Sequence, residues 1–329
     1  MKKALITGIA GQDGSYLAEL LLPAGYEVFG LAKDSSSLEY LPEGVTLLRG
    51  DVTDADTVKR LVQTAQPDEV YNLASITDLK TAYGYPELTR EVIYTSVGVL
   101  LDECLKANPA VRFLQASSSE IFLPSNNPLD ENAPRAWQTD NPYAQAKMQA
   151  DRDFIEKPRK EKNTFACSAF LFNHESPRRS DKRALRKITS TLAKIHAGKA
   201  STLSIGNVEM VRDWGFAGDY ARAMHSMLQQ ATPEDFVIAS GELHSVKNAI
   251  NLAASFLDIE LTWDGVGVET VAYDRTGKKI VETSPEFYKD LEPLPKVGNA
   301  GKAEKILGWK PSVSFSSLIE MMVAAEGEK

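Results

Sequence analysis

Short apolar runs alternate with amphipathic stretches along the first half of the chain. The runs at 3–7, 26–31, 45–50, 68–74, 111–117 and 164–172 have the length and the β-branched or aromatic content of strands. The intervening segments 15–22, 54–65, 89–107 and 142–155 repeat their apolar positions with helical spacing. Strands that are apolar on both faces and separated by helices are typical of a parallel sheet covered on both sides. The pattern predicts an α/β fold with a doubly wound parallel sheet of about six strands.

The pattern changes after residue 172. Proline and arginine gather in 173–187, several helical patterns follow, and the remaining strand candidates are few and short. We therefore expect a smaller α/β region at 173–329 that is discontinuous, because 213–240, with a strand candidate at 234–240, returns to the first sheet. Pro158 is expected to end the helix that begins near residue 142 early, because proline removes a backbone donor inside a helix.

The first chemical signal is the glycine run "TGIAGQDGSY". Gly8, Gly11 and Gly14 stand three apart, directly after one predicted strand and directly before a helix. Glycines in this position permit a tight turn and let the backbone approach a pyrophosphate, which the free N–H groups of the helix start stabilise. An ordinary strand-to-helix turn would need no such spacing. Residues 1–172 are therefore predicted to form a Rossmann-type NAD(P)-binding domain.

The choice between NAD and NADP rests on the end of the second predicted strand. An acid there binds a ribose hydroxyl, whereas a base accepts a 2′-phosphate. The chain offers both, because Lys33 stands beside Asp34, with Ser35 following. The lysine and the serine favour NADP, and NAD stays open. Asp51, after the third strand, is placed either to contact the adenine or to cap the following helix.

The second chemical signal is "YAQAK", which places Tyr143 and Lys147 on one face at the start of a helix. A phenol has a pKa of about 10 in water, and a nearby ammonium makes it a better base at neutral pH. A solvent-exposed Tyr/Lys pair is the ordinary alternative. About 25 residues earlier the strand end "QASSSEIF" supplies Ser118, which would hold a substrate hydroxyl for Tyr143, and Glu120, which could otherwise cap a helix or lie in a solvated loop.

Composition and charge exclude several classes of function. The 329 residues are 43% apolar and 25% charged, with a formal net charge of −8, so a nucleic-acid partner is not expected. Cys104 and Cys167 lie far apart and have neither a disulfide nor a metal-ligand spacing. We expect no metal, no signal peptide, no membrane partner and a reducing cytoplasmic location.

These motifs together are similar to those of a known family. The glycine loop, the serine-rich strand end and the Tyr/Lys pair resemble the extended short-chain dehydrogenase/reductases that act on nucleotide sugars. Longer stretches, "QASSSEIF", "LFNHESPRR", "RDWGFAGDY" and "LGWKP", resemble the GDP-mannose 4,6-dehydratases of that group, and the similarity runs to about Ser314. The resemblance implies the catalytic set Ser118, Glu120, Tyr143 and Lys147.

The resemblance also implies the ligand contacts and the reaction. A dinucleotide would contact Gly8, Gly11, Gln12, Asp13, Gly14, Lys33, Asp51, Val52, Leu73, Ala74, Ser75, Tyr143, Lys147 and His174, although His174 could equally be a packing residue. GDP-mannose or a similar nucleotide sugar would contact Asn173, Glu175, Arg178, Lys187, Arg212 and Glu292, with Arg212 clamping the diphosphate. The product would be a 4-keto-6-deoxy sugar nucleotide, formed with Glu120 as the base that removes the proton of carbon 5.

Some stretches depart from the family pattern. Residues 75–80 and 289–297 differ from it, and Lys289 stands where the family has an arginine. The nucleotide sugar therefore stays open. Two alternatives remain. One is a related epimerase, reductase or dehydratase that acts on another nucleotide sugar, and the other is a non-catalytic NAD(P)-binding homologue. A homodimer or homotetramer is expected.

Overall fold

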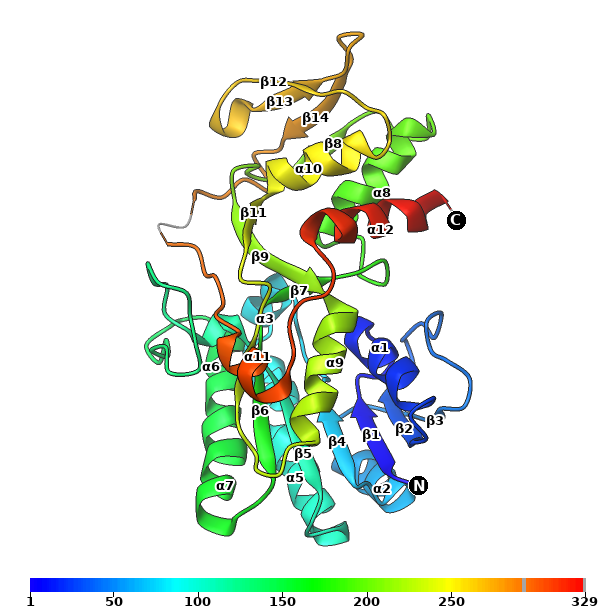
Figure 1. Cartoon of the computed structure of the whole chain (residues 1–329), viewed down its shortest axis with the longest axis vertical. Helices are drawn as coiled ribbons and strands as arrows, with labels where there is room; N and C mark the ends of the chain where they lie inside the picture. The colour runs from blue at the N-terminus through cyan, green and yellow to red at the C-terminus, as the bar shows by residue number, and fades with distance from the viewer. Residues whose placement is uncertain (292–293, 328–329) are drawn as a thin grey trace.

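The computed structural model describes residues 1–291 and 294–327, and its largest element is a seven-stranded sheet in the lower half of Figure 1. The strand order is β10-β6-β5-β4-β1-β2-β3, and neighbouring strands run parallel throughout. The strands are β1 (Lys3–Thr7), β2 (Glu27–Ala32), β3 (Thr46–Arg49), β4 (Glu69–Asn72), β5 (Arg112–Ser118), β6 (Ala166–Leu171) and β10 (Phe236–Ile238). This is the order of a doubly wound dinucleotide-binding sheet, so the predicted fold class is confirmed.

Helices cover both faces of this sheet. One face carries α1 (Gln12–Leu21), α9 (Ala217–Leu228) and α11 (Gly301–Leu307), and the other carries α2 (Ala55–Ala65), α5 (Ser96–Ala107) and α6 (Pro142–Ala150). Successive residues of β1 divide between the two cores: Ala4 and Ile6 pack with α1 and α9, whereas Leu5 packs with α2 and α5. Alternate side chains of a strand point to opposite faces, so each central strand must be apolar on both.

Two long helical segments contain π-helical turns. The first runs through α4 (Pro86–Arg90) and η1 (Glu91–Thr95) into α5, and the second runs from α6 through η3 (Asp151–Glu156) into α7 (Lys157–Lys162). The prediction that Pro158 ends the helix early is wrong. Pro158 lies in the first turn of α7, where a backbone N–H is not needed for a bond within that helix, and the helix ends at Lys162.

Two smaller sheets form the upper region of Figure 1 and its connection to the large sheet. The three-stranded sheet holds β7 (Asn173–Glu175), β9 (Val211–Phe216) and β11 (Leu243–Ser245), and the four-stranded sheet holds β8 (Leu203–Ile205), β12 (Thr262–Asp264), β13 (Val271–Tyr273) and β14 (Lys279–Thr283). The helices α8 (Ala184–His196), α10 (Val246–Ser255) and α12 (Phe315–Gly327) pack on a separate apolar core with β8 and β14. The short elements are α3 (Leu79–Gly84), η2 (Ser119–Ile121) and η4 (Gly267–Glu269).

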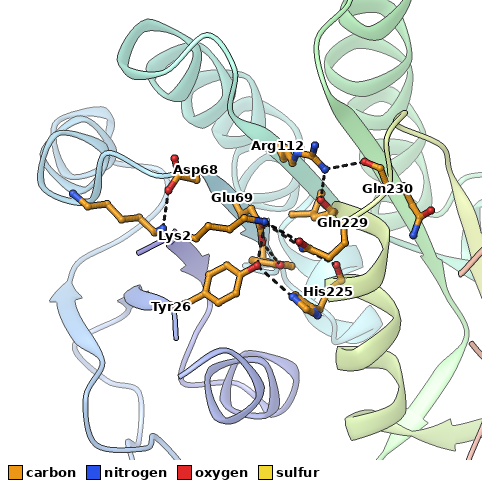
Figure 2. Close-up of polar contacts among 11 residues, drawn as sticks. Lys2, Tyr26, Asp68, Glu69, Arg112, His225, Gln229 and Gln230 are labelled. Atoms are coloured by element: carbon orange, nitrogen blue, oxygen red, sulfur yellow. Dashed lines mark hydrogen bonds and ion pairs between the residues drawn. The ribbon is translucent and has the colours of Figure 1, made fainter. Parts of the chain in front are cut away.

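A buried carboxylate joins several elements at the amino ends of the parallel strands, the edge of the sheet opposite the site described below. Glu69 accepts hydrogen bonds from Lys2 at 2.9 Å, Tyr26 at 3.2 Å, Tyr71 at 2.8 Å and Gln229 at 3.1 Å. Figure 2 shows the Tyr26 hydroxyl lying between Glu69 and His225 of α9. Because Gln229 directly follows α9, the network fixes the end of that helix to the strands it covers.

The described part of the chain, 1–291 and 294–327, contains no helix with the length and hydropathy needed to cross a membrane.

Candidate active site

The glycine turn lies where β1 meets α1. Gly8 has a positive φ of +68°, and a Cβ there would lie 3.1 Å from the backbone of Ala74. A Cβ on Gly14 would lie 2.5 Å from the Cα of Ile9 and 2.7 Å from the carbonyl oxygen of Gly8. Gly8 must be glycine because of its positive φ, and Gly14 must be glycine because the helix and the turn approach each other closely there. The helix begins at Gln12, three residues before the predicted start.

A cavity of about 300 Å³ opens in front of this turn, at the carboxyl ends of the strands. Its lining includes the predicted contacts Gly8, Gly11, Gln12, Asp13, Gly14, Lys33, Val52, Leu73, Ala74 and Ser75. Thr7 donates to Asn72 at 2.6 Å and accepts from the backbone N–H groups of Leu73 and Ala74, both at 3.1 Å, so a buried hydrogen-bond network holds this wall. Gly50 and Val52 form the opposite wall after β3.

One end of the cavity carries a cation. Lys33 and Ser36 line it, whereas Asp34 and Asp51 do not. The Lys33 ammonium forms an ion pair with Asp51 at 2.9 Å, and Asp51 also accepts from the Thr53 backbone N–H at 3.0 Å. The helix α2 is capped by another residue, Asp54, so Asp51 is not its cap.

A second cavity, of about 180 Å³, continues from the first and shares Asp13, Leu73, Ser75, Thr77 and Arg179 with it. The strand end at β5, the start of α6 and the end of β6 bring the predicted catalytic residues to this one space. Ser118, Glu120, Tyr143 and Lys147 all line it. Ser75 lines both cavities, and its buried hydroxyl oxygen has no hydrogen-bond partner among the described residues. A bound ligand that spans both cavities fits this unpaired donor.

Burial dominates the electrostatics of the Tyr143 and Lys147 pair. Burial raises the pKa of Tyr143 to about 12, against a lowering hydrogen bond from Ser118. Burial also lowers the pKa of Lys147 to about 8, against the attraction of Asp151. The Lys147 nitrogen lies 5.7 Å from the centre of the Tyr143 ring. The phenol is therefore neutral at pH 7 until a further positive charge is added beside it.

A buried acid that sequence reasoning missed lies behind Lys147. Asp151, one helical turn after Lys147, accepts from the hydroxyls of Ser117 at 2.5 Å and Ser168 at 2.6 Å. Burial raises the pKa of Asp151 to about 6, while both serine hydrogen bonds lower it. Its spacing of four residues from Lys147 is visible in the sequence, but its burial depends on β5 and β6, which only the fold brings together.

Glu120 stands at the mouth of the second cavity. It lies in the short helix η2, whose first turn is capped by Ser118, since the Ser118 hydroxyl oxygen accepts from the Glu120 backbone N–H at 3.2 Å. Its side chain is 39% exposed and forms an ion pair with Lys296 at 3.3 Å. The cap fixes the backbone of Glu120 relative to Ser118, so the carboxylate projects from the same strand end as the serine hydroxyl.

His174 joins the glycine turn to β7. Its Nε2 lies 3.0 Å from Asp13 Oδ2, and its Nδ1 lies 2.7 Å from the Phe172 carbonyl oxygen. Burial opposes the charged imidazole, but the Asp13 carboxylate prevails and raises the pKa of His174. Gln12 adds a second link, donating to the His174 carbonyl at 3.1 Å and accepting from Ser176 at 2.7 Å. His174 lines the second cavity as well, so its contacts combine packing with ligand access.

The residues expected to bind the nucleotide sugar are spread out. Asn173 lines the second cavity. Glu175 is buried 3.5 Å from Arg179, and Arg178 binds Ser15 at 2.9 Å and Glu19 at 2.6 Å on α1. Lys187 of α8 lies 4.3 Å from the centre of the Phe287 ring, and Arg212 lies on β9. Glu175, Arg178, Lys187 and Arg212 line neither cavity, and Glu292 lies outside the described residues.

Two arginines that were not predicted occupy the second cavity. Arg179 lines both cavities, and Arg183 lines the second and donates to the Thr77 hydroxyl at 3.0 Å. Both belong to the proline- and arginine-rich stretch that follows β7. The cluster of charge was visible in the sequence, but the structure is needed to tell which of its arginines point inward.

The arrangement pairs a first cavity lined by the glycine turn with a second one that holds a phenol, a serine and a carboxylate. Such a set can exchange protons at a sugar carbon and its hydroxyl. The described residues contain no group of three or more His, Cys, Asp or Glu side chains arranged to hold a metal ion.

Comparison with known proteins gives concordant results. A family model described as GDP-mannose 4,6 dehydratase matches residues 5–322. GDP-mannose 4,6 dehydratase 2 of Caenorhabditis elegans is 40% identical over 99% of this chain and 89% of its own length. The human GDP-mannose 4,6 dehydratase is 38% identical over 99% and 91%. A crystal structure of UDP-glucose 4-epimerase from Thermotoga maritima superimposes with a TM-score of 0.82 at 20% identity, covering 99% of this chain and 98% of that one.

Proposed function

This chain belongs to the GDP-mannose 4,6-dehydratase family, and we propose how its residues convert GDP-mannose into GDP-4-keto-6-deoxymannose. The enzyme is a hydro-lyase, because the net reaction removes one water from the sugar. The observation that carries the proposal is the second cavity, where Ser118, Glu120 and Tyr143 face one space that continues into the glycine-lined cavity.

The first step is proton removal at the 4-hydroxyl. Ser118 orients this hydroxyl, and Tyr143 takes its proton, with Lys147 stabilising the phenolate. A bound oxidised nicotinamide dinucleotide supplies the hydride acceptor for carbon 4, a positive charge beside the phenol, and finally the hydride that carbon 6 receives. The positive charge matters, because burial raises the pKa of Tyr143 to about 12.

The second step is elimination. The 4-ketone acidifies carbon 5, and Glu120 takes the proton of that carbon. The electron pair of the C5–H bond forms the C5–C6 double bond and the C6–O bond breaks. The departing hydroxide takes the proton that Tyr143 removed from the 4-hydroxyl and leaves as water, so the phenolate of Tyr143 is restored. Glu120, whose side chain is 39% exposed, exchanges this proton with solvent and returns a proton to carbon 5 when carbon 6 is reduced, so the carboxylate ends as it began.

The family binds a nicotinamide dinucleotide, and for this chain we propose NADP. The glycine turn, Val52 and the 73–75 wall would hold the dinucleotide. Lys33 and Ser36 line the end of the cavity, whereas the neighbouring acid Asp34 does not, and this supports acceptance of a 2′-phosphate. Asp51 would hold Lys33 in place through its ion pair.

The nucleotide end of the substrate is proposed to reach the second region. The proposed contacts remain Asn173, Glu175, Arg178, Lys187, Arg212 and Glu292, with the unpredicted Arg179 and Arg183 beside the sugar. We propose that residues 1–172 and 213–240 form the dinucleotide-binding domain, which also carries the catalytic residues. The rest of 173–329 would form the region that binds the nucleotide sugar. A homodimer or homotetramer in the cytoplasm is proposed, and the two free, buried cysteines suit a reducing compartment.

Mass spectrometry of the product tests the proposal. Purified protein incubated with NADP and GDP-mannose is expected to yield a sugar nucleotide lighter by one water, with no net change in the reduced dinucleotide. A reductase or dehydrogenase would instead change the dinucleotide stoichiometrically. Tyr143→Phe is expected to stop the first step and Glu120→Gln the second. Full activity in either variant would contradict the role given to that residue.

A further inference from the structure

Lys296 makes the ion pair at the mouth of the catalytic cavity. Its ammonium lies 3.3 Å from Glu120 Oε2 and its side chain is 18% exposed. Among the residues that the structure describes, it is the one that bonds this carboxylate. Lys296 comes from the segment after β14, 176 residues from Glu120 in the chain. It lies in the stretch 289–297, which departs from the family pattern, and no sequence motif points to it.

The segment that carries Lys296 is held on both sides. Leu129 donates its backbone N–H to the Val297 carbonyl at 2.8 Å and accepts from the Asn299 N–H at 2.8 Å. The N–H of Gly298 donates to the buried carboxylate of Asp213 at 3.0 Å. Asp213 lies on β9 and also accepts from the backbone N–H groups of residues 240 and 241 at 2.9 and 3.0 Å. The backbone beside Lys296 is therefore fixed.

The cavity linings show from which side Lys296 approaches Glu120. Glu120 lines the second cavity together with Tyr143, and it also lines a third cavity of about 610 Å³. Lys296 lines only the third one. The ammonium therefore reaches the carboxylate from outside the space that would hold the sugar, and it does not compete with the sugar for that space.

We propose that Lys296 is a positioning residue for Glu120, whose carboxylate it holds oriented toward carbon 5 of the sugar. This inference rests on the proposed role of Glu120 as the base of the elimination. A half-exposed carboxylate without a partner rotates freely and is solvated by water, which slows proton abstraction at carbon. An ammonium on a fixed backbone restricts that rotation and keeps the reacting oxygen near its target. The ion pair adds little to folding stability at this exposure.

The test compares Lys296→Met, which keeps the aliphatic stem but removes the charge, with Lys296→Arg, which keeps the charge. Lys305→Met is the matched control, since Lys305 is exposed on α11 and its replacement removes the same net charge. The substrate is GDP-mannose deuterated at carbon 5. Three quantities are followed: kcat and KM, the transient absorbance of reduced dinucleotide, and the release of deuterium to solvent.

Lys296→Met is expected to lower kcat about tenfold with KM unchanged, because base catalysis of this kind contributes about 10²- to 10⁴-fold and only part of it is lost. Reduced dinucleotide should accumulate transiently, because the first step still runs while deuterium release is slow. Lys296→Arg should recover most of the rate, and Lys305→Met should behave as wild type. A structural defect would slow both steps alike.

The proposal is overturned if Lys296→Met keeps kcat within about twofold of wild type, or if Lys305→Met shows the same loss. Glu120→Gln separates this failure from failure of the proposed mechanism. If Glu120→Gln blocks deuterium release while Lys296→Met does not slow it, only the positioning role fails. If Glu120→Gln releases deuterium at the wild-type rate, the role of Glu120 as base fails first.

Discussion

The Lys147 ammonium lies 5.7 Å from the centre of the Tyr143 ring but donates its hydrogen bond, at 2.5 Å, to the Ala116 carbonyl. It therefore acts on the phenol through its charge and not by a direct bond in this arrangement. Burial disfavours the charged ammonium, and it is the main reason why the pKa of Lys147 is lowered to about 8. Loss of that proton removes the positive charge that favours the phenolate.

The rate should consequently fall as pH rises through about 8. We expect the basic limb of kcat/KM for GDP-mannose near this pH, and Lys147→Arg should move it upward because a guanidinium keeps its charge.

The free energy of unfolding should change in the opposite direction and increase as pH rises. The folded chain loses the proton near pH 8 and the unfolded chain near 10.5, so the contribution of Lys147 to the free energy of unfolding increases between these values. Urea unfolding of the wild type and of Lys147→Met across this pH range measures the contribution of Lys147 to the free energy of unfolding.

Cofactor preference should depend on Lys33. Its replacement by alanine removes the cation that lines the end of the first cavity, and we expect up to about a tenfold loss of affinity for NADP with little change for NAD. The effect is limited because the side chain is 53% exposed. Calorimetric titration with each dinucleotide measures both affinities. Asp34→Asn is the control, and a matching loss of NADP affinity there would contradict the assignment.

The glycine turn should not tolerate a methyl group at Gly14. Its Cβ would lie 2.5 to 2.7 Å from backbone atoms of residues 8 and 9, which cannot move aside independently. We expect Gly14→Ala to lower the free energy of unfolding by about 1–3 kcal/mol or more and to weaken dinucleotide binding. Gly84→Ala serves for comparison, since nothing lies within 4 Å of its Cβ. Equal thermal stability of the two variants would count against the close approach.

The network around Glu69 should support folding but not catalysis. Glu69→Ala leaves the hydroxyls of Tyr26 and Tyr71 without their shared acceptor, and Lys2 without its partner. Breaking a buried network of this kind costs about 3–5 kcal/mol. Chemical denaturation should show this loss. KM at low temperature should stay unchanged, because Glu69 is the first residue of β4 and the site lies at the carboxyl ends of the strands. A changed KM with unchanged stability would contradict this separation.

The sequence was most informative where the evidence is local. Periodicity placed the first six strands, and β1 was predicted at its observed bounds, because buried parallel strands and their helices have distinct apolar patterns. The glycine spacing and the Tyr143/Lys147 spacing are local in the same way, and they predicted residues that line the first and the second cavity. The helix through Pro158 was predicted wrongly, because a π-helical turn before it could not be read from residue types.

Other features depend on contacts that are distant along the chain. Asp151 is buried only because Ser117 and Ser168 lie on neighbouring strands. Arg179 and Arg178 are adjacent, yet one lines both cavities and the other binds α1. Lys296 meets Glu120 only through the path of the chain between β14 and α11. Residue type and spacing carry no information about contacts between residues that are so far apart in the sequence.

The pairing of β10 with β6 has a consequence for any attempt to divide the molecule. β10 begins at Phe236, so a fragment that ends at residue 172 would lack this strand. The backbone of β6 would then be unpaired along one side. An open, apolar edge of this kind recruits other chains and leads to aggregation. Protease cleavage between the two regions is therefore expected to give insoluble material in place of a free dinucleotide-binding fragment, and shortened versions for expression would need to retain β10.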